Sequence, residues 1–198
     1  MTRRTPSGAA VLQPEVTTAI VDAVFDELVD KGVGRLSMEG VAARAGVGKS
    51  ALYRRWPSKD KMVMAVLADL SVPLAEITDT GSLRGDVRAT VEAVTGWITH
   101  PKFRRVLADL IAEGERHPER AAAVVDAIGG PRREHAFATL RRAIDRGELP
   151  ADVDLELAAD LFAAPMYWRM IVRRGPVEDD YLDRVTEMIL RALGATTC

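Results

Sequence analysis

A run of hydrogen-bond donors between Lys49 and Arg54 is the first part of this sequence that suggests a chemical task. Lys49 and Ser50 begin the run, and Tyr53 and Arg54 follow one helical turn later. Such groups donate hydrogen bonds to phosphate oxygens and to base edges. The pattern predicts a short helix that enters the major groove of double-stranded DNA, N-terminal residues first.

The residues around this run meet the requirements of a helix-turn-helix, in which two short helices cross over a tight turn. The motif needs a small residue at the crossing, a residue that bends the chain, and an apolar anchor on the second helix. Ala42, Gly46 and Leu52 fill these positions at the usual offsets of four and six residues. We therefore predict a helix-turn-helix head here.

Four helices are predicted in this first third of the chain. Gly32 ends the first helix, because glycine tolerates the left-handed conformation that follows many helices. Ser37 and Ser58 are the expected N-caps of the second and fourth helices, and Pro73 stops or kinks the fourth. The predicted ranges are about 14–31, 38–45, 48–55 and 59–72.

The head segment reads LSMEGVAARA followed by GVGKSALYRRWPSKDKM. It resembles the N-terminal signature of the tetracycline-repressor (TetR) family of transcriptional regulators. The resemblance covers about Ile20 to Leu67, and beyond that it extends only to the helical architecture. It implies a symmetric dimer that binds an operator and releases it when a small molecule binds the body.

The resemblance also implies roles for single residues. Ser37, Tyr53 and Lys59 look like phosphate contacts, and residues 48–50 look like the groove-facing start of the recognition helix. Gly48 departs from the family, which often has serine or threonine there. The candidates for DNA contact are Ser37, Gly48, Lys49, Ser50, Ala51, Tyr53, Arg54, Lys59 and Lys61.

Some of these candidates also fit positions that have no role in DNA binding. Lys59 and Lys61 also suit a solvated helix start, where charged side chains simply face water. Tyr53 also suits a core position with its hydroxyl exposed. The choice between these interpretations depends on which side of the helix faces solvent.

Composition and charge place this head in a larger all-α chain. The 198 residues are 47% apolar, enough for a buried core, and no alternating run of β-branched residues predicts a strand. Residues 1–61 carry ten Lys/Arg and seven Asp/Glu, a net of +3, whereas residues 62–198 carry seventeen and twenty-two, a net of −5. Chance can produce such asymmetry, but it also fits a head that meets phosphate and a body that does not.

The predicted organisation has three parts. Residues 1–13 form a disordered basic arm, residues 14–61 form the DNA-binding domain, and residues 62–198 form a helical effector-binding and dimerisation domain to which the fourth helix leads. Cys198 is the only cysteine, so a reducing cytoplasm is expected. The first residues do not resemble a signal peptide, and no apolar run predicts a membrane span.

The body is predicted as a bundle of six further helices. Glycine and proline residues mark the breaks between them, among which are the triplet Gly129-Gly130-Pro131 and the pair Gly175-Pro176. Pro165 lies inside a predicted helix and is expected to bend it or to free a carbonyl. The predicted ranges are about 82–99, 101–116, 119–128, 131–147, 154–174 and 178–193.

Apolar stripes on the last two helices predict a homodimer. A single recognition helix contacts few base pairs, so two half-sites multiply affinity and specificity. The same stripes could instead fill the core of one chain. The interface candidates are Leu155, Ala159, Phe162, Met166, Tyr181, Val185, Met188 and Ile189.

Aromatic and sulfur-containing side chains of the body predict an effector pocket. Such residues at helical spacing are also typical of an ordinary core, and the spacing does not identify a ligand. The pocket candidates are Trp97, His100, Phe103, Phe137, Phe162, Met166, Tyr167 and Arg169.

No arrangement of residues predicts catalysis. The three histidines lie far apart and lack a metal-binding spacing, and no glycine loop suits a phosphate cofactor. We therefore expect neither an enzyme, nor a metal site, nor a cofactor. The alternatives that remain are an effector-independent or nucleoid-type DNA-binding protein with the same head, and a bundle whose helix-turn-helix binds another protein.

Overall fold

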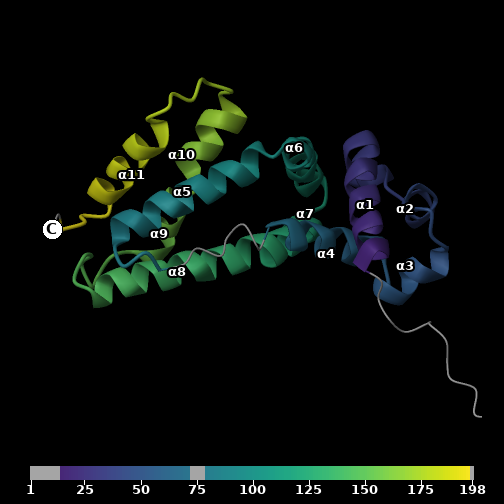
Figure 1. Ribbon diagram of the computed structural model, residues 1–198, viewed down its shortest axis with the longest axis horizontal. Coiled ribbons are helices and arrows are strands. Elements are labelled where there is room, and N and C mark those ends of the chain that lie inside the picture. The colour runs from purple at the N-terminus through teal and green to yellow at the C-terminus, as the bar shows by residue number, and fades with distance from the viewer. Residues whose placement is uncertain (1–13, 72–78, 197–198) are drawn as a thin grey trace, which may run out of the picture. The chain divides into compact units, whose positions relative to one another are not determined.

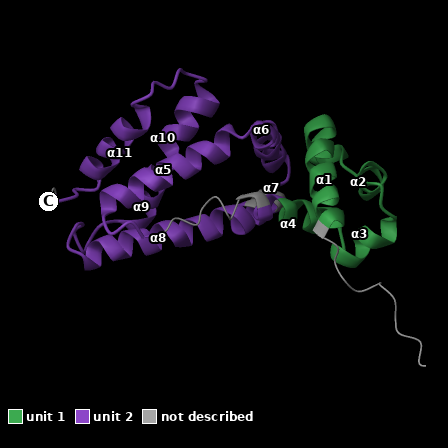
Figure 2. Ribbon diagram, viewed as in Figure 1, with its two compact units in different colours: residues 1–66 green, residues 67–198 purple. Residues whose placement is uncertain are grey.

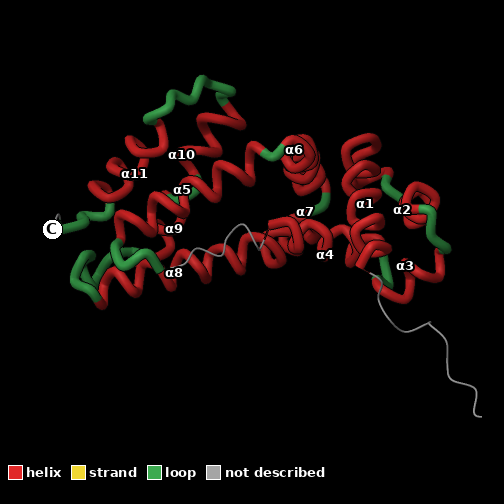
Figure 3. Tube along the Cα trace, in the orientation of Figure 1, coloured by secondary structure: helices red, strands yellow, loops and turns green. Residues whose placement is uncertain are grey.

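The computed structural model describes residues 14–71 and 79–196, and within these ranges it contains helices and no strand (Figures 1 and 3). The predicted N-terminal arm, residues 1–13, and Cys198 lie outside the described residues. The chain divides into two compact units, residues 1–66 and 67–198 (Figure 2). No helix of the described ranges is long and apolar enough to cross a lipid bilayer.

The first unit is built on α1 (Pro14–Arg35), α2 (Met38–Ala45), α3 (Lys49–Arg55) and the start of α4 (Lys59–Ser71). α1 packs against α2, and α2 against α3. The apolar faces of the four helices meet in one core. Its fully buried members include Ile20, Val24, Val41, Leu52, Met62 and Val66.

Local signals explain where these helices begin and end. Ser37 is extended and its side chain accepts a hydrogen bond of 3.1 Å from the backbone N–H of Gly40, which starts α2. The Ser58 hydroxyl accepts from the N–H of Lys61 at 3.2 Å in the first turn of α4. Gly32, with a φ of 75°, interrupts the regular helix within α1. The predicted caps are confirmed. The predicted end of the first helix at Gly32 is instead a kink, after which α1 continues to Arg35. Pro73, the predicted stop of the fourth helix, lies outside the described residues.

The second unit is a bundle arranged around α5 (Leu83–Thr99). α5 contacts α6 (Pro101–Arg116), α8 (Gly130–Asp145), α10 (Ala164–Met166), the π-helix η3 (Tyr167–Val172) and α11 (Tyr181–Ala192). The remaining elements are α7 (Pro118–Val124), the π-helix η2 (Val125–Gly129) and α9 (Leu155–Leu161). The core of the unit includes Val87, Val91, Leu140, Phe162, Met166 and Ile189.

The predicted break at Gly129-Gly130-Pro131 is wrong. The chain stays helical from α7 through η2 into α8, and Gly129 has ordinary helical angles. Pro131 lies in the first turn of α8. A proline inside a helix removes one hydrogen bond and clashes with the preceding turn, and the wider π turn of η2 lets the helix absorb that defect without ending.

The segment predicted as one helix over 154–174 is divided near Pro165. α9 ends at Leu161, and Pro165 falls in the first turn of α10, where its missing N–H costs little. The Tyr181 hydroxyl donates to the Pro165 carbonyl at 3.1 Å, so α11 is tied to this bend. The predicted bend is present.

Candidate nucleic-acid interface and ligand cavity

The turn between α2 and α3 depends on Gly46. This residue adopts the left-handed conformation, with a φ of 66° and a ψ of 28°, which glycine reaches without a steric penalty. The N–H groups of Gly46 and Val47 close the end of α2 on the carbonyls of Ala43 and Ala42, at 3.3 and 3.0 Å. α3 therefore follows α2 across a fixed, tight bend.

One face of α3 packs against the head, and the other face is exposed to solvent. Leu52 is completely buried in the core of the head. Lys49, Ser50 and Arg54 are exposed, and Tyr53 is 49% exposed, so Tyr53 is not a core aromatic. The donors predicted to meet DNA thus lie on the solvent side of the helix, as groove reading requires.

Lys49 has a neighbour that the sequence did not predict. Its Nζ atom lies 3.0 Å from Oε1 of Glu39 on α2. The hydrogen bond from Lys49 lowers the pKa of the exposed Glu39 carboxyl below its ordinary value. A carboxylate therefore sits beside the first donor of the candidate recognition helix.

The flanking candidates have structural roles as well. The Ser37 oxygen caps α2, and its hydroxyl can still donate outward. Nζ of Lys59 lies 3.3 Å from the carbonyl oxygens of both Val33 and Gly34, so it binds the C-terminal end of α1. Lys61 is exposed. Of the two α4 lysines, Lys61 is the one that fits a simple solvated or phosphate-facing position.

A buried carboxylate fixes α2 against α1. Glu27 is 2% exposed, and its two oxygens accept hydrogen bonds from Lys31 at 2.7 Å and from Arg44 at 3.2 Å. Arg44 also binds Asp30 at 2.7 Å. Sequence reasoning missed this cluster, although the place of Glu27 on the apolar side of α1, three residues after Val24, is a usable signal.

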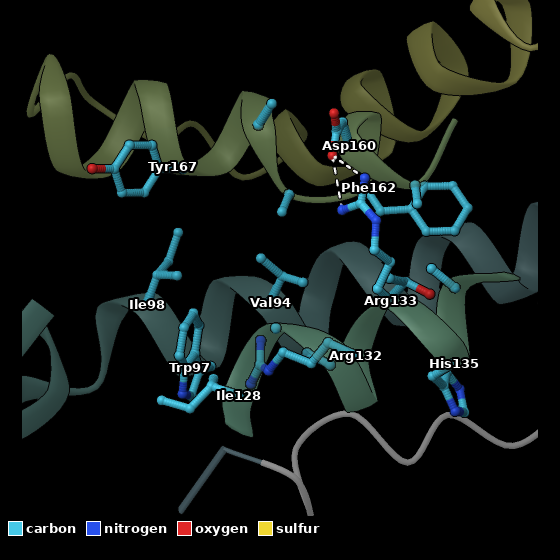
Figure 4. Close-up of a pocket in the computed structure, with 17 residues that line it drawn as sticks. Val94, Trp97, Ile98, Ile128, Arg132, Arg133, His135, Asp160, Phe162 and Tyr167 are labelled. Carbon is cyan, nitrogen blue, oxygen red and sulfur yellow. Dashed lines mark hydrogen bonds and ion pairs between the residues drawn. The ribbon is translucent and has the colours of Figure 1, made fainter. Parts of the chain in front are cut away.

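The body contains a cavity of about 510 Å³, walled by α5, η2 and α8 on one side and by α9, α10 and η3 on the other (Figure 4). Most of its wall is apolar. Residues of both sides contribute, among them Val94, Trp97, Ile98, Ile128, Phe162 and Tyr167. This size is in the range of pockets that hold small organic molecules.

Only part of the predicted pocket lines this cavity. Trp97, Phe162 and Tyr167 do, whereas five other candidates do not. Met166 is buried in the core, and Arg169 binds the Pro176 carbonyl and the Glu178 carboxylate. The residues that lie elsewhere are His100, Phe103, Phe137, Met166 and Arg169.

Sequence reasoning missed the charged residues of the cavity wall. The guanidinium carbon of Arg132 lies 3.7 Å from the centroid of the Trp97 ring, and burial lowers the pKa of Arg132 to about 10. Arg133 binds Asp160 at 3.1 Å, which links α8 to α9 (Figure 4). A pair of arginines after a proline is typical of a solvated helix start, so the sequence contains no clear signal for them.

Most of the predicted dimer residues belong to the core of one chain. Leu155 is half-buried, and Met188 is 69% exposed. The six that are buried are Ala159, Phe162, Met166, Tyr181, Val185 and Ile189. For these six the alternative of an ordinary core describes the structure, so a dimer surface has to use exposed side chains instead.

Comparison with known proteins gives a consistent result over both units. Residues 20–66 match the family described as bacterial regulatory proteins, tetR family, and residues 77–189 match the tetracyclin repressor-like C-terminal domain. The chain is 30% identical over 181 residues to the DNA-binding transcriptional repressor TetR of Mycobacteroides abscessus, across 89% of this chain and 93% of that protein.

Two further similar proteins are also described as transcriptional regulators. The HTH-type transcriptional regulator YdeS of Bacillus subtilis is 26% identical over 179 residues, which is 90% of each chain. The crystal structure of the TetR family transcription regulator SCO0332 superimposes with a TM-score of 0.71 at 28% identity. It covers 93% of this chain and 99% of that one.

Proposed function

The chain belongs to the tetracycline-repressor (TetR) family of transcriptional regulators, and from this premise we propose that it is a dimeric repressor that a small molecule releases from its operator. The observation that carries the DNA-binding half of this proposal is the outward face of α3. Lys49, Ser50, Tyr53 and Arg54 are exposed there, while Leu52 holds the helix in the head.

The proposed dimer follows from the size of the reading element. α3 has seven residues and reaches only a few base pairs, so a second copy one helical turn along the DNA raises both affinity and specificity. Exposed apolar side chains on the body support such a partner surface. Met188 on α11 is 69% exposed and Leu157 on α9 is 62% exposed.

The proposed effector response rests on the cavity of the body. A pocket of about 510 Å³ with an apolar wall favours a small molecule that fills it, because the apolar surfaces of ligand and wall are then removed from water. A ligand that binds one arrangement of the helices better than another shifts the population towards it. Release of DNA requires that this favoured arrangement be the one with the weaker operator affinity.

The experiment is selection of bound fragments from the source genome with the full-length protein. We expect enrichment of a short inverted repeat, because a two-fold dimer reads two matching half-sites. Binding to the enriched fragment should weaken steeply as salt rises, because phosphate contacts release counterions. Absence of any enriched sequence, or affinity that does not respond to salt, would contradict the proposal.

A further inference from the structure

Small side chains leave the room inside the cavity of the body. Five alanines line it, and they come from both walls. They are Ala93 on α5, Ala136 on α8, and Ala159, Ala163 and Ala164 in the segment from α9 to α10. An alanine side chain ends at Cβ, so facing alanines leave space that longer side chains would fill. The resulting volume of about 510 Å³ is enough for a small organic molecule.

The rest of the uncharged wall is mostly aliphatic and aromatic. Val94 and Ile98 on α5 lie opposite Tyr167 of η3 (Figure 4). Hydroxyl groups come from Thr90 and Tyr167, and the Thr90 hydroxyl donates to the carbonyl of Asp86 at 2.7 Å. A ligand with an apolar body therefore removes both its own surface and the surface of this wall from water.

The acidic residue of the wall is paired with an arginine of the same wall. Arg133 on α8 donates to Asp160 on α9 at 3.1 Å (Figure 4). Glu156, one turn before Asp160, also accepts from Arg133, at 2.5 Å. A cationic ligand would have to displace Arg133 from Asp160, and an anionic ligand would have to displace the two carboxylates from Arg133. Each group already has its counterion, so neither attracts a charged ligand as a lone charge would.

The other ionisable residues of the wall are also engaged. Figure 4 shows the Arg132 side chain lying along the wall towards Trp97, and its guanidinium carbon is 3.7 Å from the centroid of that ring. This cation–π contact occupies one face of the guanidinium, and Arg132 has a further interaction within the protein. His135 is not without a partner either. The wall therefore presents no unengaged charge to a ligand.

We propose that this cavity binds an uncharged, mainly apolar molecule in preference to an ion of the same shape. An ion that enters the cavity loses part of its hydration, and no unpaired opposite charge in the wall compensates for that loss. An uncharged molecule avoids this cost and keeps the gain from burial of its apolar surface. The proposal names the ligand class of the effector site, so it rests on the proposed function.

The test compares ketones with ions of matched shape by calorimetric titration of the full-length protein. One series is 2-acetylnaphthalene, 2-naphthoate and protonated 1-(2-naphthyl)ethylamine, and the other is decan-2-one and nonanoate. At neutral pH both acids and the amine are charged. We expect the ketone of at least one series to bind at least about 10-fold more tightly than each of its ions. A smaller preference in both series, or no binding of either ketone at about 0.3 mM, would overturn the proposal.

A variant of the ion pair tests why ions are disfavoured. Asp160→Asn removes one carboxylate from Arg133, so the acid should gain affinity relative to the ketone by about 3- to 10-fold. Asp145→Asn, the same change at an exposed site of α8 outside the cavity wall, should keep the wild-type preference. A wild-type preference in Asp160→Asn would contradict the role of this pair in the selection.

A second set of variants locates the ligand. Ala93→Leu places a larger side chain in the wall and should weaken binding of the ketone by about 10-fold or more. Ala112→Leu, at an exposed site of α6 outside the wall, is the control and should leave that affinity unchanged. If circular dichroism shows that Ala93→Leu does not fold, Ala163→Leu on the opposite wall takes its place. Wild-type affinity for the ketone in a folded wall variant would contradict binding in this cavity.

Operator release is measured separately, so that the two proposals can fail separately. A ketone that binds in the cavity without weakening operator binding supports the ligand class and contradicts release by an effector. Release by one of the ions, with no preference for the ketone, contradicts the ligand class and supports the proposed function.

Discussion

The carboxylate of Glu27 on α1 lies against Gly40 on α2, where a Cβ on residue 40 would stand 2.6 Å from Oε2 of Glu27. Lys31 and Arg44 hold the two oxygens of that carboxylate, which is 2% exposed. The carboxylate therefore cannot swing aside without breaking two partly buried hydrogen bonds. The close packing of α1 on α2, and with it the position of α3, depends on glycine at residue 40.

Gly40→Ala should therefore destabilise the head. Overpacking costs about 1–3 kcal/mol, and it opposes the gain of up to about 1 kcal/mol that alanine brings to a helix interior. Hydrogen exchange of the α1 and α2 amides measures the result in the head alone. We expect faster exchange in the variant.

A double-mutant cycle identifies the cause. In a Glu27→Ala background the obstructing carboxylate is gone, so Gly40→Ala should become neutral or stabilising. The same destabilisation in both backgrounds would show that the contact with Glu27 is not the reason for glycine at this position.

Lys59→Ala and Lys61→Ala should have different effects on the free energy of unfolding. Lys59→Ala removes the donor from the carbonyls of Val33 and Gly34 and should lower the free energy of unfolding by about 1 kcal/mol. Lys61→Ala, the same change at an exposed site of α4, should leave stability within about 0.5 kcal/mol. Thermal unfolding gives the comparison. A Lys59→Ala protein that keeps wild-type stability but loses DNA affinity would favour the phosphate contact that the family resemblance implies.

Glu39→Gln should strengthen binding to DNA of any sequence. The Glu39 carboxylate lies 3.0 Å from the Lys49 ammonium, and it opposes the approach of phosphates to that ammonium. The gain should be largest at low salt, because salt screens exposed charges. Fluorescence anisotropy with an unrelated duplex measures it, with Glu15→Gln on the exposed start of α1 as the control. Equal affinity of the two variants would remove this role from Glu39.

Met188→Glu should weaken the proposed dimer without harming the fold. Met188 is 69% exposed on α11, so a charge there disturbs a partner surface and not the core. Ile189→Glu is the contrasting change, because Ile189 is 2% exposed and its replacement should unfold the body. Light scattering and circular dichroism report the two effects. A Met188→Glu protein that stays dimeric at the same concentration would place the interface elsewhere.

The head was predictable because its signals are local. Ser37 and Gly46 mark the ends of α2 through hydrogen bonds and backbone angles within a few residues. Leu52 and the donors of α3 lie on different sides of the helix, so their spacing already indicates which side is buried. The Glu39–Lys49 and Glu27–Arg44 pairs were not predicted, since each joins residues ten or more positions apart.

The positions of most helices in the body could be predicted, but most residues of the cavity wall could not. Gly129-Gly130-Pro131 has the composition of a break, but tertiary packing keeps the segment helical through a π turn. Three aromatic residues that were predicted to line a pocket do line this cavity, namely Trp97, Phe162 and Tyr167. Arg132 gives no such signal, because only the packed structure shows that its guanidinium turns onto Trp97 and away from solvent.

DNA reading by the outward face of α3 is tested most directly with wild-type and Lys49→Ala proteins. The affinity of each protein for a selected operator and for a scrambled duplex is measured by fluorescence anisotropy at one salt concentration. We expect the wild type to prefer the operator by a factor of about 10³ or more. Lys49→Ala should keep its helical content and lose about 1–3 kcal/mol of that discrimination if Lys49 reads a base. A variant with wild-type affinity for both duplexes and an unchanged preference between them would contradict the account.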